Sequence, residues 1–414
     1  MNNRLLGFSL FAITAATVIA VPYLEDAEAV TGPPPMAVPA VNPTANIIGP
    51  DIAAPAIQGQ GDIEVVFVLD TTGSMSELIQ AAKEKIWSIA TTMASAQNSP
   101  RIKIGLVAYR DQGEAYVTKM VDLTDDLDSL YSTLMDFKAE GGGDTPEAVH
   151  EALADAVNNM SWTRNQDTYR SIFLVGDAPG HNRHAPELSF NQSLKTAAAK
   201  GIVVNTIQCG KLASTRRQWQ QVAAAGQGAF FNVSSGGDAV AIATPFDKEM
   251  AELSVKLDDT RLFYGDAKAR ETQQRKTAAT AKLHAGASDA TRARRATYNL
   301  SKSGERNALG DGELVDDIAK GRVKLDEVKA EQLPQALRKL APEEQAAFVE
   351  KRAKTRETLR DQMSELAKQR AAYLKKKAED ADGFADSLDQ KLYGAIRAQA
   401  AEKGFRYEAD SASF

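Results

Sequence analysis

The chain of 414 residues contains a single cysteine, Cys209, and this scarcity excludes several classes of protein. No intrachain disulfide can form, and a cysteine-based metal centre has no ligands. Cys209 lies in an apolar run, and no neighbour in sequence would activate its thiol. We therefore expect a buried core residue rather than a nucleophile. No cysteine follows the apolar N-terminal segment, which excludes a lipoprotein anchor.

Histidine is almost as scarce, with four residues in the whole chain. Two of them, His181 and His184, stand close together. Without a nearby cysteine or a third histidine they make a poor zinc site, so we expect a polar surface loop. A response to pH or contact with a ligand is the alternative.

The sequence also lacks any dense basic run, which argues against nucleic acid as a partner. The net charge of −6 is unevenly distributed. Residues 261–414 hold 31 Lys and Arg against 25 Asp and Glu, whereas residues 1–260 hold 18 against 30. The two parts therefore differ in sign, and contact between them is expected.

The N-terminus has the pattern of a targeting segment. Arg4 precedes an apolar run, Leu5 to Val21, and Ala27-Glu28-Ala29 offers a cleavage site. We predict a signal peptide over residues 1–29, and hence a secreted or periplasmic chain. An uncleaved membrane anchor through residues 5–21 is the rival, although the run is short for a spanning helix.

Proline is concentrated in one segment, since seven of the fifteen prolines fall between Pro33 and Pro55. Helices and central strands do not tolerate that density, so residues 30–60 are expected to form an extended linker. From residue 61 to 258, runs typical of strands alternate with runs typical of helices. This alternation predicts an α/β domain with a doubly wound, mainly parallel sheet and helices on both faces. The expected strands are Ile63–Leu69, Ile102–Ala108, Tyr116–Leu123, Ser171–Val175, Ile202–Gln208 and Ala229–Val233; the expected helices are Met75–Ala96, Asp126–Phe137, Pro146–Asn158, Leu188–Lys200, Arg216–Ala225 and Asp238–Leu257.

Beyond residue 258 the strand pattern ends and the sequence becomes helical. Residues 259–341 are expected to be a helical connector, and Pro342 begins a long helix that reaches about Ala378. A second helix carries Leu388, Leu392 and Ile396 on one face. Two narrow apolar stripes predict a helical hairpin or coiled coil over residues 342–414, packed on itself, on a partner or on the preceding α/β domain.

Oxygen-bearing side chains follow two of the predicted strands. Asp70, Thr72 and Ser74 come directly after the first strand, and Asp177 follows the fourth. Ligands of open α/β sheets bind beyond the carboxyl ends of the strands. Thr145, which precedes a predicted helix, adds a further hydroxyl near the same edge. Hard oxygen ligands of this kind suit a small divalent cation such as Mg²⁺. The alternative is that Asp70 and Thr145 only cap the helices that follow them.

The set Asp70-x-Thr72-x-Ser74, with Thr145 and Asp177 at a distance, resembles the metal-ion-dependent adhesion site of von Willebrand factor type A domains. Thr72 replaces the serine of that pattern but keeps the hydroxyl. The segments around Arg110-Asp111 and Asp177 to His181 are most similar to the bacterial branch of the family.

That resemblance implies a direct role for three hydroxyls, those of Thr72, Ser74 and Thr145, as ligands of Mg²⁺, with Mn²⁺ or Ca²⁺ as other candidates. Asp70 and Asp177 would complete the shell, and one open position would accept an Asp or Glu carboxylate of a protein partner. Asp144 is an additional acid beside this site, and Arg110 with Asp111 would shape its rim or form a local ion pair.

The sequence therefore favours a non-enzymatic, cation-dependent binding protein of the cell envelope. A metal-dependent hydrolase or phosphotransfer enzyme is one alternative, because a catalytic metal also keeps an open position. A structural envelope protein with a coiled coil is another. The enzyme hypothesis lacks support from motifs: Gly210-Lys211 is not preceded by the first glycine of a phosphate loop, since Asn205 stands there.

Overall fold

The computed structural model describes residues 61–142, 145–181, 188–233, 242–379 and 388–407. The signal peptide and the linker predicted within residues 1–60 lie outside this part of the chain, as do Asp144 and His184. Among the described helices, none combines the length and apolar character needed to cross a membrane.

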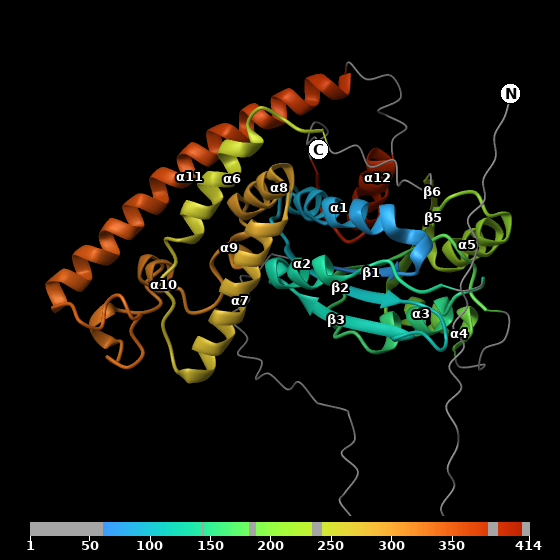
Figure 1. Cartoon of the computed structure of the whole chain (residues 1–414), viewed down its shortest axis with the longest axis horizontal. Helices are drawn as coiled ribbons and strands as arrows, with labels where there is room; N and C mark the ends of the chain where they lie inside the picture. Colours follow the sequence, from blue (N-terminus) through green and yellow to red (C-terminus); the bar gives the residue numbers. More distant parts are fainter. Residues whose placement is uncertain (1–60, 143–144, 182–187, 234–241, 380–387, 408–414) are drawn as a thin grey trace, which may run out of the picture. The chain divides into compact units, whose positions relative to one another are not determined.

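The six predicted strands are confirmed and form one sheet of order β3-β2-β1-β4-β5-β6. All neighbouring pairs are parallel except β2 and β3, which are antiparallel. Strand order therefore runs outward in both directions from β1 and β4 at the centre (Figure 1). The strands are β1 (Asp62–Asp70), β2 (Arg101–Tyr109), β3 (Thr118–Thr124), β4 (Tyr169–Gly176), β5 (Ile202–Cys209) and β6 (Gln227–Val233).

Alternate residues of β1 enter two separate cores, as the two-residue period of a strand requires. Val65 and Phe67 pack with α1, α2 and α12 on one face. Val66 and Val68 pack with α3, α4 and α5 on the other. The expected helices on both faces are thus confirmed (Figure 1). Their bounds are α1 Ser76–Ala94, α2 Leu127–Asp136, α3 Val149–Asn158, α4 Phe190–Ala199, α5 Ala213–Ala225 and, at the end of the chain, α12 Leu388–Ala401.

The helix expected over Asp238–Leu257 begins later than its pattern suggested. The structure has α6 at Asp247–Asp258, and described residues 242–246 are not helical. Pro245 disfavours helical geometry at Thr244. The Thr244 backbone N–H and hydroxyl donate instead to the Asp247 carboxylate, at 2.8 Å each. This local turn holds the start of α6 at Phe246 and Asp247.

The region after residue 258 does not form the predicted hairpin. The long helix α11 (Pro342–Glu379) packs against α6 and α8, whereas α12 packs against α1 and β6. The apolar stripes were read correctly, but each is buried by a different part of the chain. Leu359 and Met363 of α11 join the core of α6 and α8, while Leu392 of α12 joins the core of the sheet. The remaining elements are α7 (Ala267–Gly286), α8 (Asp289–Leu300), α9 (Glu305–Leu309), α10 (Leu314–Ala319) and two short 3₁₀ turns, η1 (Gly73–Met75) and η3 (Leu325–Glu327).

The division expected at residue 258 does not separate two cores, because α7 packs on α2 and α8 packs on α1. A largely buried ion cluster lies at this junction. Arg295 of α8 donates to both carboxylate oxygens of Asp128 of α2, at 2.6 Å each, and to Asp258 of α6 at 2.8 Å. Arg295 and Asp128 are both inaccessible to solvent. Attraction between the two oppositely charged parts of the chain, expected from the sequence, is present here.

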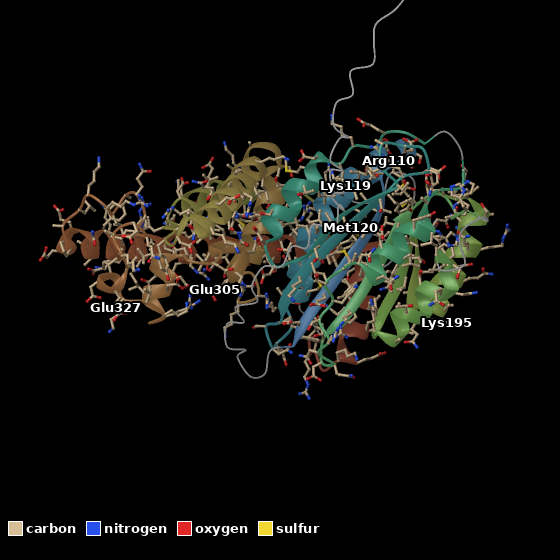
Figure 2. The ribbon with its side chains drawn as sticks, turned by 90° about the horizontal axis from the view of Figure 1, so that it is seen from below. Arg110, Lys119, Met120, Lys195, Glu305 and Glu327 are labelled. Atoms are coloured by element: carbon tan, nitrogen blue, oxygen red, sulfur yellow. The ribbon has the colours of Figure 1, made fainter. Side chains whose placement is uncertain are left out.

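The outer edge of the sheet at β3 is exposed. Lys119 and Met120 lie on this strand (Figure 2). Met120 is 44% exposed and, with Leu212, is one of two large hydrophobic side chains exposed to this degree within the described ranges.

Candidate functional site

The candidate site lies where the strand order reverses, between β1 and β4. In doubly wound sheets this switch point opens a crevice beyond the carboxyl ends of the strands. Asp70 is the last residue of β1, and Asp177 directly follows β4. The two strands are parallel neighbours, with Leu69 beside Val175. The structure therefore brings the two predicted carboxylates to one edge of the sheet.

Asp70 is buried under this edge, with 1% of its surface exposed. Its Oδ1 accepts hydrogen bonds from the Thr72 backbone N–H at 2.8 Å and from the Thr72 hydroxyl at 2.6 Å. Its Oδ2 has no hydrogen bond of ordinary distance and angle among the described residues, although the Asp177 backbone N–H faces the carboxylate and lowers its pKa. Burial, opposed by the Thr72 bonds and assisted by the charge of Asp177, raises the pKa of Asp70 to about 7. A buried carboxylate with one oxygen unsatisfied is a group that a cation would stabilise.

The other four predicted residues, Thr72, Ser74, Thr145 and Asp177, line one open cavity of ≈ 410 Å³. The hydroxyl oxygens of Thr72 and Ser74 lie 3.3 Å apart. Asp177 is half-buried, whereas Ser74 and Thr145 are exposed. The predicted residues thus contribute three hydroxyls and one carboxylate to the cavity wall, and Asp70 adds a carboxylate buried beside it.

The helix-cap alternative is not what the structure has. The residue at the N-cap of α1 is Met75, and that of α3 is Ala148, and neither helix has a side-chain cap bond. Asp70 instead turns its carboxylate back on Thr72. The role of Asp70 and Thr145 at this edge is therefore not explained by capping.

Backbone hydrogen bonds hold the segments of the site together. The loop after β4 meets the segment before α3, because Glu147 N–H donates to the Pro179 carbonyl at 3.0 Å. The turn after β1 meets a glycine segment, because Gly73 N–H donates to the Gly141 carbonyl at 3.1 Å. These contacts place Thr145 on the same cavity as Thr72 although 73 positions separate them in the sequence.

Two charged residues of this cavity wall, Glu147 and Lys211, were missed from the sequence, as was the apolar Leu212. Glu147 is buried, and Lys211 is exposed on the loop between β5 and α5. Neither residue belongs to a motif of fixed spacing. The sequence analysis considered Lys211 only as part of a phosphate loop, which Asn205 excludes. The expectation for Cys209 is confirmed: it is buried, and burial, followed by the charges of Asp177 and Asp70, raises the pKa of its thiol well above the ordinary value.

Within the described residues, no three His, Cys, Asp or Glu side chains cluster closely enough to hold a metal ion by themselves. The candidate set has a different chemistry, with two carboxylates and three hydroxyls. Hydroxyl and carboxylate oxygens are ligands that Mg²⁺ and Ca²⁺ accept, and the unsatisfied Asp70 Oδ2 fits a cation at this place. The residues present are therefore compatible with the predicted cation, and its binding remains a proposal.

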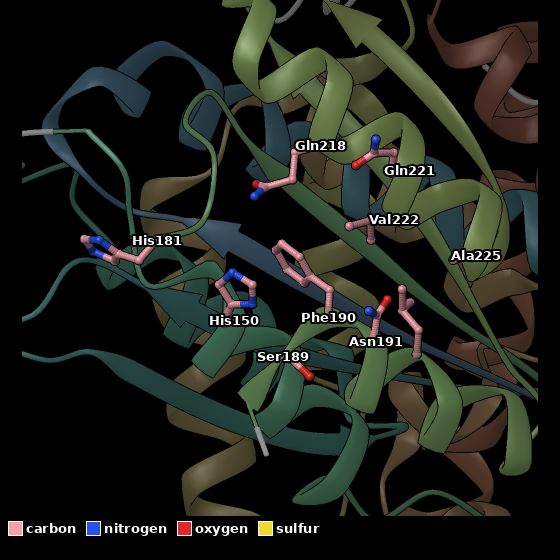
Figure 3. Close-up of a pocket in the computed structure, with 10 residues that line it drawn as sticks. His150, His181, Ser189, Phe190, Asn191, Gln218, Gln221, Val222 and Ala225 are labelled. Carbon is pink, nitrogen blue, oxygen red and sulfur yellow. The ribbon is translucent and has the colours of Figure 1, made fainter. Parts of the chain in front are cut away.

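The predicted rim residues form a neighbouring cluster. His181 Nε2 lies 2.5 Å from Asp111 Oδ1, and Arg110 Nη2 lies 3.6 Å from Glu140. His181 also lines a second cavity of ≈ 270 Å³ between α4 and α5. There the ring of His150 stacks on Phe190 at 3.7 Å between centroids (Figure 3). Figure 3 shows Gln218 and Gln221 of α5 across from this stacked pair.

The fold and the site define a class: an open α/β domain with a ligand crevice at the switch point and hydroxyl and carboxylate groups gathered there. The family model of the von Willebrand factor A domain matches residues 64–244. Residues 64–244 of the chain therefore form a von Willebrand factor A domain. Such domains are, in general, non-enzymatic modules of protein–protein interaction and adhesion.

Two curated proteins and one solved structure illustrate what part of the chain is similar to. A putative ariadne-like RING finger protein of Acanthamoeba polyphaga mimivirus is 25% identical over 162 residues, which are 38% of this chain and 15% of that protein. The von Willebrand factor A domain-containing protein 7 of Mus musculus is 41% identical over 87 residues, 21% of this chain and 9% of that protein. The solved VWA domain of SpRpn10 aligns at 14% identity and a TM-score of 0.33, over 44% of this chain and 94% of that one. The chain thus spans less than a sixth of either curated relative.

Proposed function

We propose that this protein binds a protein partner through a divalent cation, Mg²⁺ or alternatively Mn²⁺ or Ca²⁺, held at the carboxyl edge of the sheet. The observation that carries the proposal is Asp70 Oδ2, a buried carboxylate oxygen without a hydrogen bond of ordinary distance and angle among the described residues, next to Asp177 and beside the hydroxyls of Thr72 and Ser74. Thr145 completes the set. A buried charged oxygen left unsatisfied is costly unless a ligand compensates for it.

The same set explains why the partner would offer a carboxylate. Three neutral hydroxyls and two carboxylates supply five oxygen ligands and just balance the charge of a divalent cation, so one of the six ligand positions of Mg²⁺ stays open. An Asp or Glu of the partner is then a favourable further ligand. The cavity is open, with exposed Ser74 and Thr145 at its mouth, so a side chain carried by another protein can reach it.

The test is a thermal melt of residues 30–414 in Mg²⁺, Mn²⁺ or EDTA, beside Asp70→Ala and the surface control Asp311→Asn. The side chain of Asp311 is 89% exposed, and none of the predicted ligands contacts it. We expect a cation to raise the melting temperature of the wild type and of the control but not of Asp70→Ala, because binding to the folded state alone stabilises it. Equal melting temperatures in Mn²⁺ and EDTA, even at millimolar Mn²⁺, would contradict the proposal.

A second measurement tests the open position. Bound Mn²⁺ enhances the relaxation of water protons while a water occupies a ligand position. We expect a short peptide with a central Asp to lower that enhancement, and its Asn counterpart to leave it unchanged.

The proposal includes a place of action outside the cytoplasm, secreted or periplasmic, with a signal peptide over residues 1–29. It rests on the apolar segment Leu5 to Val21 and the Ala27-Glu28-Ala29 site. N-terminal sequencing of the exported protein tests it: a chain that begins near residue 30 supports cleavage, and one that keeps Leu5 to Val21 supports a membrane anchor.

A further inference from the structure

The loop that joins β5 to α5 has a fixed backbone at the mouth of the candidate cation site. Gly210 N–H donates to the Val233 carbonyl at 2.8 Å, and the Asn232 side-chain amide donates to the Gly210 carbonyl at 2.8 Å. The Gln208 side-chain amide donates to the Leu212 carbonyl at 2.8 Å. The backbone on both sides of Lys211 is therefore held by side chains and backbone of β5 and β6.

The two residues at the end of this loop, Lys211 and Leu212, have exposed side chains. Lys211 is exposed and forms no ion pair or hydrogen bond within the part of the chain that the structure describes. Leu212 is 45% exposed. Both line the cavity that also holds Thr72, Ser74 and Asp177. A cationic and an apolar side chain thus stand together at its mouth.

Leu212 and Lys211 would each contribute favourable free energy to the binding of a partner. An exposed leucine leaves apolar surface in water, and its burial against another aliphatic group is favourable. A loop that is already ordered loses little conformational freedom when it binds, so more of that contact contributes to affinity. Lys211 adds positive charge at the entrance, which attracts an anionic segment and disfavours a basic one.

We infer that the site recognises an acidic residue of the partner only together with an aliphatic side chain next to it in the partner's sequence. The acidic side chain enters the cation site, the aliphatic one covers Leu212, and Lys211 favours further negative charge nearby. This inference rests on the proposed function, and it makes Lys211 and Leu212 the residues that select the partner. Neither belongs to the predicted ligand set.

The test uses biotinylated peptides of the form Gly-Gly-Asp-Leu-Gly, Gly-Gly-Asp-Ser-Gly and Gly-Gly-Asn-Leu-Gly, displayed densely on streptavidin beads. The amount of chain 30–414 retained is measured in Mg²⁺ and in EDTA. We expect Asp-Leu to retain about tenfold more protein than Asp-Ser, the preference that burial of one aliphatic side chain supports. The Asn-Leu peptide retains none above the EDTA background.

Two variants and their matched controls locate the preference. Leu212→Ser lowers retention on Asp-Leu to the level of Asp-Ser, whereas Met120→Ser, at the equally exposed residue on β3, leaves it unchanged. Lys211→Ala lowers retention on both Asp peptides about two- to fivefold and weakens its salt dependence, as an exposed charge pair does. Lys195→Ala, at an exposed residue of α4, leaves the retention and its salt dependence unchanged.

The outcomes separate the two proposals. Retention that depends on Mg²⁺ and on Asp but is equal for Asp-Leu and Asp-Ser, or equally selective in Leu212→Ser, overturns the inference and leaves the proposed function standing. Retention of none of the peptides in Mg²⁺ overturns both. Binding of the Asn-Leu peptide as strongly as Asp-Leu would show an apolar contact without a cation site, and would also overturn both.

Discussion

Asn205, in the middle of β5, and Gln399, on the last helix, exchange two hydrogen bonds through their side-chain amides. Asn205 Nδ2 donates to Gln399 Oε1 at 3.2 Å, and Gln399 Nε2 donates back to Asn205 Oδ1 at 2.8 Å. The Tyr169 hydroxyl donates to the same Gln399 oxygen at 2.7 Å. Asn205 is fully buried, and 194 positions separate it from its partner. Helix α12 therefore supplies a polar group that the interior of the sheet requires.

We predict that Gln399→Ala destabilises the fold by about 1–3 kcal/mol, the usual cost of leaving a buried polar group without its partner. The Tyr169 hydroxyl loses its acceptor, while Asn205 keeps its bond to Ser171. The measurement is urea denaturation of the full chain. Gly394→Ala on the same helix is the control of opposite sign: a Cβ there meets nothing within 4 Å, so a gain of about 0.5–1 kcal/mol is expected from helix propensity. A neutral Gln399→Ala would show that α12 is held by apolar packing alone.

The surface against which α12 packs could not be predicted from the sequence. Its apolar face was visible in the spacing of Leu392 and Ile396, and both are buried as expected. An amphipathic pattern shows that a face is covered but not by what, because the partner surface is set by the tertiary fold. The strands were easier, since long apolar runs between turn residues have one stable arrangement in a parallel sheet. For this reason all six strands and the mainly parallel sheet were predicted, although the strand order was not, whereas the prediction that the last two helices pack as a hairpin was wrong.

Some residues of the candidate site could likewise be predicted from the sequence, and others could not. Asp70, Thr72, Ser74 and Asp177 follow predicted strands, so their convergence could be predicted from the parallel sheet alone. Lys211 and Glu147 line the same cavity without any spacing that marks them. Their positions depend on how separate loops pack against each other. No local sequence pattern predicts that packing.

The Arg295 cluster is predicted to be essential for the junction between the sheet and the C-terminal helices. Arg295→Met leaves the buried carboxylate of Asp128 without its ion-pair partner, whereas Asp258 keeps Arg261 and His284, and a loss of about 3–5 kcal/mol is expected. Arg275→Met is the control, because the Arg275–Glu271 pair is 67% exposed at both side chains and contributes little. Denaturation curves of equal midpoint for the two variants would contradict the assignment.

Acid should weaken the same junction. Burial alone would raise the pKa of Asp128, but the charge and hydrogen bonds of Arg295 hold it well below the ordinary value. A carboxylate with a depressed pKa in the fold stabilises it above the unfolded pKa of about 3.9, and this contribution disappears as the pH falls further. Urea midpoints measured from pH 7 to 3 should therefore drop steeply below about pH 4. The drop should be shallower in Arg295→Met, where the cause of the depression is gone; an unchanged slope would refute this.

Thr145 offers a way to separate the cation site from the fold. It is exposed and makes no hydrogen bond within the described ranges. We predict that Thr145→Val leaves the melting temperature in EDTA unchanged and reduces or abolishes the increase caused by Mg²⁺. Thr272→Val, at an exposed threonine of α7, should keep the full increase. If Thr145→Val retains it as well, Thr145 is not a ligand.

Gly176 leaves room for the carboxylate of the site, and its substitution gives the last prediction. A Cβ at this position would lie 2.3 Å from the Tyr109 hydroxyl oxygen and 3.1 Å from Asp70 Cβ and Oδ2. Tyr109 is buried, and its hydroxyl donates to the Val175 carbonyl at 3.3 Å, so it has little freedom to withdraw. Gly176→Ala should cost about 1–3 kcal/mol by overpacking and weaken the response to Mg²⁺. Tyr109→Phe removes the nearest atom, so the double variant should recover stability relative to Gly176→Ala, with a coupling energy of about 0.5–3 kcal/mol in a double-mutant cycle. Additive losses in that cycle would show that the two residues do not compete for this space.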